Sequence, residues 1–383
     1  MRVAIATESF LPTLNGVTTS VCRVAEQLGA LGHEVLVLCP RPAPDTHAGH
    51  RVRTVPTVSV RSFPTGLPTR EVRTALAAFA PDVVHVASPF VLGARALHDA
   101  AALGLPSVAI YQTDMPAYLA QHAGPVAPGA AGAAWRWVRR VHGLADRTLA
   151  PSRATLDELR DHGVPRTALW GRGVDAVLFD PARRGTEPVR RLRTQLAPGG
   201  EVLVGYVGRL APEKELWRLA ALTRLPGIRL VLVGDGPSRT SADAVLSPPA
   251  RAAGALPPAF LGRLEGDALA DAYAALDVFV HPGTRETFGQ TLQEAAASGL
   301  PVVAPARGGP LDVVDDGRTG ILFDPDDPSA LTAAVRALAA DPARRERLGT
   351  AGRERTGSRS WAALTAQLVG HYDDVRAVAS TAA

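Results

Sequence analysis

The sequence has little cysteine and lacks long apolar and long basic runs. Its 383 residues include two cysteines, Cys22 and Cys39, so neither a disulfide framework nor a cysteine-ligated metal site is indicated. The basic residues are nearly all arginine, they form no extended block, and the net charge of +4 does not point to nucleic acid. An apolar run of about 18 residues, which a transmembrane helix needs, is absent, and the N-terminal apolar segment is too short for a signal peptide. We therefore expect a cytoplasmic protein, with contact at the inner membrane face left open.

The glycine fingerprint of dinucleotide-binding proteins is also missing. The loop from Phe10 to Gly16 does not follow the G-x-G-x-x-G pattern, which argues against an NAD-dependent oxidoreductase. What the sequence does contain is an alternation of apolar strands and amphipathic helices, beginning with Val3 to Ala6 and Val17 to Leu31. This alternation predicts an α/β fold with parallel sheets, and the length is that of two domains.

The most informative stretch is residues 280–294, VHPGTRETFGQTLQE. An apolar strand ends at Pro282-Gly283, and a helical pattern begins at about Phe288. The first N–H groups of a helix lack internal partners and attract anions, and Gly289 would let a ligand approach that backbone closely. Glu286 and Glu294 would repel a phosphate but accept hydrogen bonds from sugar hydroxyls. A phosphate placed between two sugar rings describes a sugar nucleotide.

This stretch resembles the E-x7-E signature of retaining glycosyltransferases of family 4, carried here by Glu286, Phe288, Gly289 and Glu294. The resemblance runs from Met1 to about residue 361. It implies the GT-B fold, in which two Rossmann-like domains with parallel sheets face each other across a cleft. The implied parts are an N-terminal acceptor domain over 1–175, a nucleotide-sugar domain over 176–355, and a C-terminal helix over 356–383 that crosses back to the N-terminal domain.

Two segments of the second half lack a clear periodic pattern. Residues 176–200 are rich in proline, glycine and arginine and predict a linker. Residues 238–258 have little apolar periodicity and predict a loop.

The donor site implied by the resemblance includes cations. Arg209 and Lys214 stand in a loop that resembles the family's GR-x-x-x-x-K motif and follows a predicted buried strand. An arginine fork and a lysine point charge suit a pyrophosphate, and they would neutralise the leaving diphosphate without a metal. Glu286 would hold the transferred sugar and Glu294 the ribose. The other donor-binding residues implied are Gly16, Arg263, Phe288, Gly289, Gln290 and Thr291.

The acceptor site is predicted from strand ends in the first half. Ligands of such folds bind beyond the carboxyl ends of strands, which favours Ser88 over the mid-strand His85, interpreted as a core histidine. Tyr111, Gln112 and Asp114 follow another strand in a loop that resembles the acceptor side of the family. Asp114 is the candidate for orienting the acceptor hydroxyl, and it also suits a helix N-cap before Pro116.

A basic, tryptophan-containing helix is predicted around Trp135–Arg140. Trp135, Val138 and Val141 share one helical face, and Arg136, Arg139 and Arg140 lie elsewhere around the helix. Such a helix can lie on an anionic membrane, or it can pack against the protein with its arginines solvated.

The resemblance implies an enzyme that transfers a hexose with retained anomeric configuration. The loop after Tyr111 is most similar to bacterial mannosyltransferases, which favours GDP-mannose as donor and a hydroxyl of a lipid-linked or small-molecule acceptor. The alternatives are a UDP-hexose-dependent enzyme of natural-product biosynthesis and a non-catalytic sugar-nucleotide binder. No cofactor or metal is expected.

Overall fold

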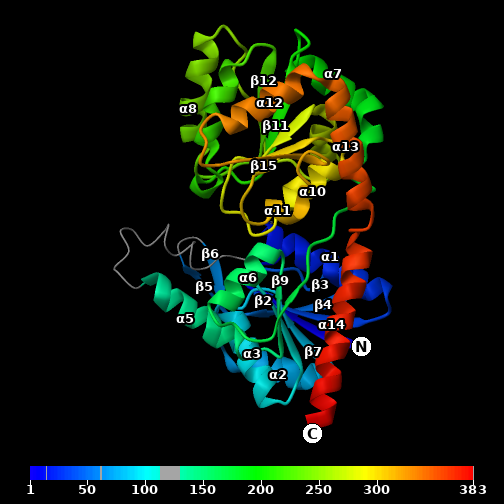
Figure 1. Ribbon diagram of the computed structural model, residues 1–383. Coiled ribbons are helices and arrows are strands. Elements are labelled where there is room, and N and C mark those ends of the chain that lie inside the picture. Colours follow the sequence, from blue (N-terminus) through cyan, green and yellow to red (C-terminus); the bar gives the residue numbers. More distant parts are fainter. Residues whose placement is uncertain (14, 61–62, 113–129, 383) are drawn as a thin grey trace. The chain divides into compact units, whose positions relative to one another are not determined.

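The computed structural model describes residues 1–13, 15–60, 63–112 and 130–382. The chain forms two compact units, shown in Figure 1. The first comprises Met1–Arg172 together with Trp361–Ala383, and the second comprises Gly173–Ser360. The C-terminal helix is therefore part of the first unit, although the whole second unit separates it in sequence from the rest.

The first unit is built on a sheet with strand order β10-β9-β8-β7-β1-β2-β4-β3. Its described strand pairs are parallel, except that β3 runs antiparallel to β4. A separate antiparallel pair joins β5 and β6. The strands are β1 (Arg2–Ala6), β2 (Glu34–Pro40), β3 (Thr46–His47), β4 (His50–Val55), β5 (Thr57–Val60), β6 (Phe63–Gly66), β7 (Val83–Val86), β8 (Ser107–Ile110), β9 (Arg147–Ala150) and β10 (Thr167–Leu169).

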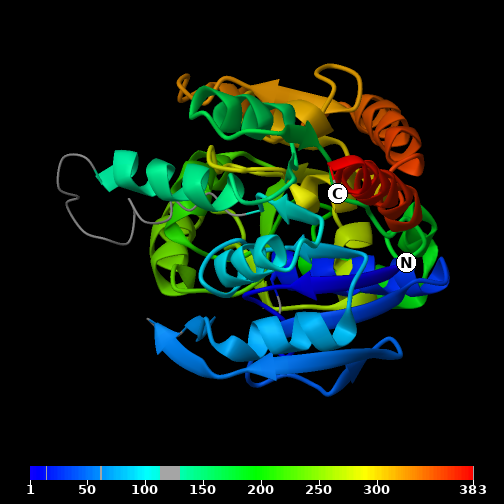
Figure 2. The same ribbon diagram turned by 90° about the horizontal axis from the view of Figure 1, so that it is seen from below.

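Helices cover both faces of this sheet, as Figures 1 and 2 show. One apolar core contains residues of α1 and α14 packed on the strands, and a second core contains residues of α2 and α3 on the other face. Burial on both faces explains why the strands read as continuous apolar runs. The helices are α1 (Gly16–Ala30), α2 (Arg70–Phe79), α3 (Leu92–Ala102), α5 (Ala130–His142), α6 (Arg153–Asp161) and α14 (Trp361–Ala382).

The C-terminal helix α14 is held to the first unit by buried contacts. Trp170 Nε1 donates to Leu364 O at 2.8 Å, and Tyr372 Oη lies 2.5 Å from His85 Nδ1 inside the core. His85 is thus the satisfied core histidine that its mid-strand position predicts.

The second unit contains a parallel sheet with the order β13-β12-β11-β14-β15-β16. Counted along the chain, this is the 3-2-1-4-5-6 order of a doubly wound Rossmann fold. The strands are β11 (Val202–Val207), β12 (Ile228–Val233), β13 (Ala259–Gly262), β14 (Val278–Val280), β15 (Val302–Pro305) and β16 (Gly320–Phe323). The helices are η1 (Pro181–Gly185), α7 (Glu187–Leu196), η2 (Pro212–Lys214), η3 (Leu216–Arg224), α8 (Arg239–Ala252), α9 (Gly266–Ala275), α10 (Gln290–Ala297), α11 (Pro310–Val313), α12 (Ala330–Ala340) and α13 (Pro342–Gly357).

Two sequence expectations for this unit are wrong. Residues 176–200 are not an unstructured linker, because η1 and α7 form there and Val189 and Leu196 are buried. Residues 238–258 are not a loop, because α8 spans most of them even with Pro248 inside the helix. Its buried Leu246 joins the apolar core that η3 also lines, so tertiary packing outweighs the local cost of proline.

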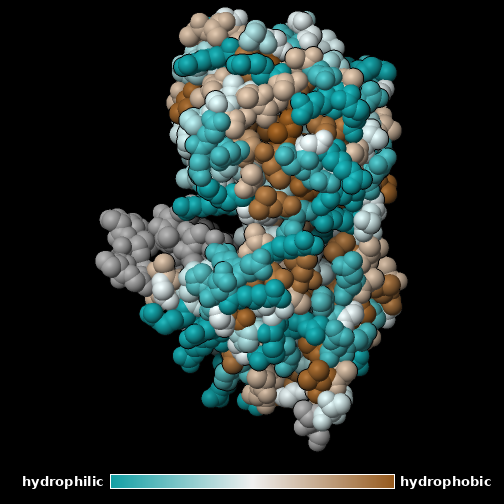
Figure 3. Space-filling view, viewed as in Figure 1, coloured by the Kyte–Doolittle hydropathy of each residue, from teal (hydrophilic) through white to brown (hydrophobic). Residues whose placement is uncertain are grey.

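Hydrophilic residues cover most of the face shown in Figure 3, with smaller apolar patches between them. Among the described residues, no helix combines the length and the apolar character that crossing a bilayer requires.

Candidate active site

The strand order of the second sheet reverses between β11 and β14, and ligands of doubly wound folds bind beyond the carboxyl ends of the strands at this point. β11 leads into Gly208 and Arg209, and β14 leads into His281. The GR-x-x-x-x-K loop and the E-x7-E stretch therefore start from neighbouring strand ends.

Three ionisable side chains meet at this switch point. Lys214 Nζ donates to Glu286 Oε2 at 2.7 Å, and Nε2 of the buried His281 lies 3.3 Å from the same oxygen. The Tyr206 ring stacks on His281, with centroids 6.2 Å apart. Burial opposes the ionisation of Glu286, but the Lys214 ammonium and the His281 ring outweigh it and hold the pKa of Glu286 well below its usual value. Glu286 is therefore an ionised and anchored acceptor, and no described residue donates a hydrogen bond to its other oxygen, Oε1.

Glycines allow the loops of this cluster to approach one another. A Cβ on Gly283 would lie 3.1 Å from Lys214 Cα, and a Cβ on Gly309 would lie 2.5 Å from Phe288 Cα. Gly309 N also donates to Glu286 O at 2.7 Å. The pair Gly308-Gly309 was missed by the sequence analysis, although two adjacent glycines after an apolar strand are a signal of close backbone approach. Backbone packing thus fixes where Glu286 stands.

The N-terminus of α10 faces the same edge of the sheet. Gly289 has φ 98°, a left-handed conformation that suits glycine, and it caps the helix. The first amides that find an acceptor within the helix are those of Leu292 and Gln293, which donate to Gly289 O. The preceding amides of Gln290 and Thr291 have no intrahelical acceptor by helix geometry, so they are available to an anion.

The side chain of Phe288 plays a different part from that of its neighbours. It is 2% exposed and belongs to the apolar core of the unit. Phe288 can therefore face a ligand only through its backbone, and its ring anchors the loop between β14 and α10.

Glu294, on α10, differs from Glu286 in its electrostatic state. Burial raises the pKa of Glu294 to about 7, although hydrogen bonds from Tyr273 and Gln290 lower it in part. Tyr273 Oη donates to Glu294 Oε2 at 2.9 Å. The two carboxylates of the E-x7-E stretch thus respond differently to pH, because Lys214 compensates the burial of Glu286 and no cation does so for Glu294.

The two arginines of the predicted donor site are held by nearby carboxylates. Arg209 pairs with Glu213 four residues later, and Arg263 Nε lies 2.8 Å from Glu265 Oε1. Both arginine side chains are about half exposed. The structure therefore brings Lys214 onto Glu286 and leaves Arg209 and Arg263 in local ion pairs at the ends of β11 and β13.

In the first unit, the predicted glycine loop is organised by Asn15. Its Oδ1 accepts from Val17 N at 3.0 Å and Thr18 N at 3.1 Å, which caps α1. Its Nδ2 donates to Ser9 Oγ, which lies 3.0 Å from Thr18 Oγ1. Gly16 begins α1 directly after this cap. The sequence indicated this turn but not the hydrogen-bond network that fixes it.

Glu8, just beyond the carboxyl end of β1, is a buried acid that the sequence analysis missed. Its Oε1 accepts from Leu92 N and from Gly93 N at the start of α3, and its Oε2 has no hydrogen-bond partner. Burial raises the pKa of Glu8 to about 7, against the lowering effect of these amides.

Three of the predicted acceptor residues, Ser88, Tyr111 and Gln112, lie beyond the carboxyl ends of β7 and β8. Gln112 Nε2 donates to Ala87 O at 3.1 Å, and its Oε1 accepts from Arg172 Nη2 at 2.6 Å. Ser88 follows β7, and the buried Tyr111 follows β8. Arg172 also reaches Gly16 O at 3.5 Å, so it joins the first residue of α1 to the segment after β8. Asp114 lies outside the described residues.

Across the part of the chain that the structure describes, His, Cys, Asp and Glu side chains form no group of three or more that would hold a metal ion.

Comparison with known proteins places the chain. The family model Glycosyltransferase Family 4 matches residues 14–178, and Glycosyl transferases group 1 matches residues 190–355. Proteins named GDP-mannose-dependent alpha-mannosyltransferase are similar along the whole chain. The Mycolicibacterium smegmatis protein is 47% identical, covering 98% of both chains, and the Mycobacterium tuberculosis protein is 45% identical, covering 100% of this chain and 99% of the relative. The Corynebacterium glutamicum protein is 42% identical, covering 99% and 90%.

Solved structures share the fold. A sucrose-phosphate synthase from Thermosynechococcus elongatus superposes with a TM-score of 0.78 at 23% identity, covering 98% of this chain and 99% of that one. Anabaena HepE, solved in complex with UDP, gives 0.78 at 19% identity, covering 98% and 100%. Because a relative is 47% identical over 98% of both chains and the family model matches, the chain belongs to glycosyltransferase family 4 and is an enzyme with the GT-B fold.

Proposed function

We propose that this enzyme transfers mannose from GDP-mannose to a hydroxyl of a lipid-linked or small-molecule acceptor, with retention of the anomeric configuration. The observation that carries the proposal is the name shared by the three relatives that are 42–47% identical over nearly the full chain. The Lys214–Glu286 pair beside the N-terminus of α10 supports it, because that arrangement suits a sugar linked to a diphosphate.

In this proposal, each group of the second unit has one task. Lys214 and the amides of Gln290 and Thr291 stabilise the negative charge on the leaving diphosphate. Glu286 Oε1 accepts a hydrogen bond from a hydroxyl of the transferred sugar, and Glu294 accepts from the ribose. Because Lys214 already bonds Glu286, one ammonium joins the sugar-binding carboxylate to the phosphate and fixes their spacing.

The bond between the anomeric carbon and the phosphate oxygen breaks as the acceptor oxygen bonds to the same face of the sugar. The acceptor proton passes to the leaving phosphate oxygen. Arg209 would leave Glu213 for the diphosphate, since an arginine fork binds phosphate oxygens well. With these cations in place, the reaction is proposed to need no metal.

The acceptor is proposed to bind at the carboxyl edge of the first sheet, near Ser88, Tyr111, Gln112 and Asp114.

If the acceptor is lipid-linked, α5 provides a membrane contact. Its Trp135 ring stacks between Tyr111 and His162, with centroids 6.3 and 3.7 Å away, so it packs inward. The exposed side chains of α5 include Arg136, Trp137, Arg139 and Arg140. A Trp137→Ala variant should bind anionic vesicles more weakly, and Trp217→Ala, which removes an exposed tryptophan of the second unit, is the matched control.

The test of the donor uses the fact that Lys214 is the only lysine in the chain. An amine-reactive acylating reagent therefore modifies one side chain besides the N-terminal amine. GDP-mannose and GDP should protect Lys214 in mass-spectrometric peptide maps, while mannose alone should not. If no nucleotide sugar changes the extent of Lys214 acylation, Lys214 is not part of the donor site.

Turnover then decides the sugar and the stereochemistry. We expect product from GDP-mannose in the presence of EDTA, with an α-linked sugar by NMR. Glu286→Ala should abolish it while Glu346→Ala, an exposed glutamate on α13, leaves it unchanged. Turnover with a UDP-hexose and none with GDP-mannose would reassign the donor, and nucleotide-sugar binding without any turnover would indicate a binding protein.

A further inference from the structure

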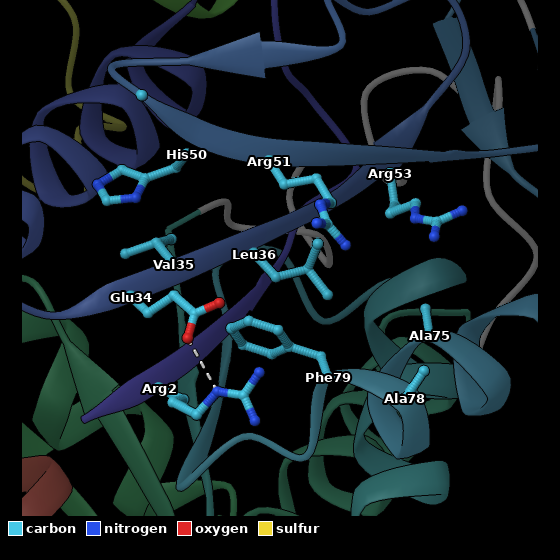
Figure 4. Close-up of a pocket in the computed structure, with 11 residues that line it drawn as sticks. Arg2, Glu34, Val35, Leu36, His50, Arg51, Arg53, Ala75, Ala78 and Phe79 are labelled. Atoms are coloured by element: carbon cyan, nitrogen blue, oxygen red, sulfur yellow. Dashed lines mark hydrogen bonds and ion pairs between the residues drawn. The ribbon is translucent and has the colours of Figure 1, made fainter.

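The first unit contains a basic pocket that the site described above does not use. It lies between β1, β2 and β4 on one side and the end of α2 on the other, with a volume of about 330 Å³ (Figure 4). This volume is at the lower end of the range for small-molecule sites. Its floor is apolar and includes Leu36, Ala75 and Phe79.

Two arginines enter the pocket from one strand. Arg51 and Arg53 are exposed on the same face of β4, while Val52 between them is buried on the other face. In a strand, residues two apart have Cα atoms roughly 7 Å from each other, so both guanidinium groups can reach one anion. Among the described residues, no carboxylate forms an ion pair with either arginine, and no acceptor binds either guanidinium group.

A third arginine is held in place on the opposite side of the pocket. Arg2 Nε donates to Glu34 Oε2 at 3.0 Å, and its guanidinium lies over the Phe79 ring, 4.5 Å from the centroid. These contacts fix the guanidinium plane and leave its two terminal nitrogens without a hydrogen-bond acceptor among the described side chains. Figure 4 shows Arg2 and Glu34 on one side of Phe79 and Arg51 on the other.

The charges of the pocket are unbalanced. Three guanidinium groups line it against one carboxylate, Glu34, which Arg2 already engages. Like charges brought together around an apolar floor repel one another, and an anion placed between them relieves that repulsion. Arginine forks bind the oxygens of both carboxylates and phosphates, and a phosphate ester, with about −1.5 to −2 charge, balances more of the positive charge here than a carboxylate does.

The pocket lies at the opposite edge of the first sheet from the predicted acceptor site. Arg2 and Glu34 are the first residues of β1 and β2, whereas the described acceptor residues Ser88, Tyr111 and Gln112 follow the carboxyl ends of β7 and β8. The five residues of β1 span roughly 13 Å between these two edges. A ligand bound here therefore does not occupy the acceptor site.

We propose that this pocket is a second ligand site, specific for a phosphate-bearing organic molecule whose apolar part rests on Phe79. Arg51 and Arg53 bind the phosphate oxygens from β4, and the terminal nitrogens of Arg2 complete the site. The phosphate can belong to a soluble metabolite or to a lipid headgroup. The site does not depend on the identity of the sugar donor.

Arginine footprinting on the full chain tests the site directly. Phenylglyoxal modifies accessible arginines, and peptide mapping reports each one separately. Glycerol 3-phosphate, pyrophosphate and phosphatidylcholine vesicles with and without phosphatidic acid serve as probes. Arg51 and Arg53 should be protected in a saturable manner, and Arg73, exposed on α2 but outside the pocket, is the internal control. Protection by the soluble probes assigns a metabolite site, and protection by phosphatidic acid vesicles alone assigns a headgroup site.

Two substitutions sharpen the test. Arg51→Gln should raise the probe concentration that half-protects Arg53 by about tenfold, the equivalent of one charge-assisted hydrogen bond. Glu34→Gln should lower it, because the one negative charge in the pocket is removed. Arg73→Gln should leave it unchanged. If Arg51 and Arg53 react at the same rate with and without every probe, or if Glu34→Gln weakens protection, the proposal is wrong.

Discussion

The two sheets present different chemistry at their switch points. In the second unit, Lys214 and His281 surround an ionised Glu286, and the open N-terminus of α10 lies beside them. In the first unit, Glu8 lies just beyond the end of β1, and burial raises its pKa to about 7. Hydrogen bonds of uncharged groups around Asn15 organise the neighbouring loop. Both folds are doubly wound, yet the second, charged edge holds an ionised carboxylate, whereas Glu8 at the first edge is partly protonated near neutral pH and shares that edge with Arg172.

This difference fits the division of labour in the proposed reaction. A diphosphate leaving group develops negative charge that needs fixed cations and amides, and these stand at the second edge. An acceptor hydroxyl carries no charge, so its edge needs shape and hydrogen bonds. Both sheets are doubly wound, although the first has eight strands with β3 antiparallel and the second has six parallel strands. The side chains at the strand ends decide which substrate each sheet suits.

The largest effect should come from removing the cation of the charged edge. Lys214→Met deletes the ammonium that compensates Glu286 and that is proposed to face the diphosphate. We expect kcat to fall by roughly 100- to 1000-fold, as for the loss of one transition-state donor. Steady-state kinetics with the preferred donor measures it. The control is Arg251→Met, which changes an exposed residue at the end of α8. Near-normal turnover in Lys214→Met would contradict the proposed role of the charged edge.

The next effect concerns Glu8 at the first edge and the stability of the fold. The pKa of Glu8 is raised from 4.5 to about 7, so ionisation is easier in the unfolded chain than in the folded one. Folding stability is then present below about pH 4.5 and is lost as the pH rises toward 7. Glu8→Gln keeps an oxygen for the Leu92 and Gly93 amides, and it should be more stable than wild type at pH 8 by at most about 3 kcal/mol.

Denaturant unfolding at pH 5 and pH 8 measures this difference between Glu8→Gln and wild type. The gap should widen from pH 5 to pH 8. A constant gap would mean that Glu8 is already ionised in the folded protein at pH 5, and that the carboxylates of the two edges do not differ in this respect.

A smaller effect is expected from the loop packing of the charged edge. Gly309→Ala places a Cβ 2.5 Å from the backbone of Phe288, so the loop that carries Glu286 must move. We expect a loss of about 1–3 kcal/mol in the free energy of unfolding, with lower kcat. Gly185→Ala, where nothing lies within 4 Å of the added Cβ, should change neither thermal unfolding nor turnover.

The smallest effect should appear in the pH dependence of nucleotide binding. Burial raises the pKa of Glu294 to about 7, so it is partly protonated at neutral pH. If ribose hydroxyls donate to it, binding favours the ionised form, and affinity for GDP should rise with pH up to about 7, by less than about tenfold per pH unit. Calorimetric titrations of wild type and Glu294→Gln from pH 5.5 to 8 separate this from the titration of the phosphates themselves. Parallel profiles for the two proteins would exclude the ribose role.

The sequence predicted the parts of the site that depend on chain-local signals. Short runs of neighbouring residues predict the strand, the break at Pro282-Gly283 and the helix after Phe288. The loop that carries Lys214 is predicted in the same way. What the sequence did not predict depends on contacts between distant segments. Examples are the Gly309 amide that holds Glu286 O and the position of Glu8 against the start of α3.

Tertiary packing also explains the wrong expectations. α8 forms although Pro248 and Pro249 weaken its local propensity, because its apolar residues have a core to enter. The predicted contact of Arg209 with the phosphate stays a prediction, and in this structure Arg209 pairs with Glu213, an acid of its own loop. Spacing along the chain identifies a cation but not the carboxylate that neutralises it.

The attachment of α14 affects how the polypeptide can mature on the ribosome. Trp361, Leu368 and Tyr372 fill the core of the first unit, yet they are translated after the whole second unit. One apolar face of the first sheet therefore stays incompletely covered while the 188 intervening residues, Gly173–Ser360, are synthesised. During that interval the nascent first unit exposes apolar, aggregation-prone surface. A stop codon just before α14 would leave this surface permanently exposed.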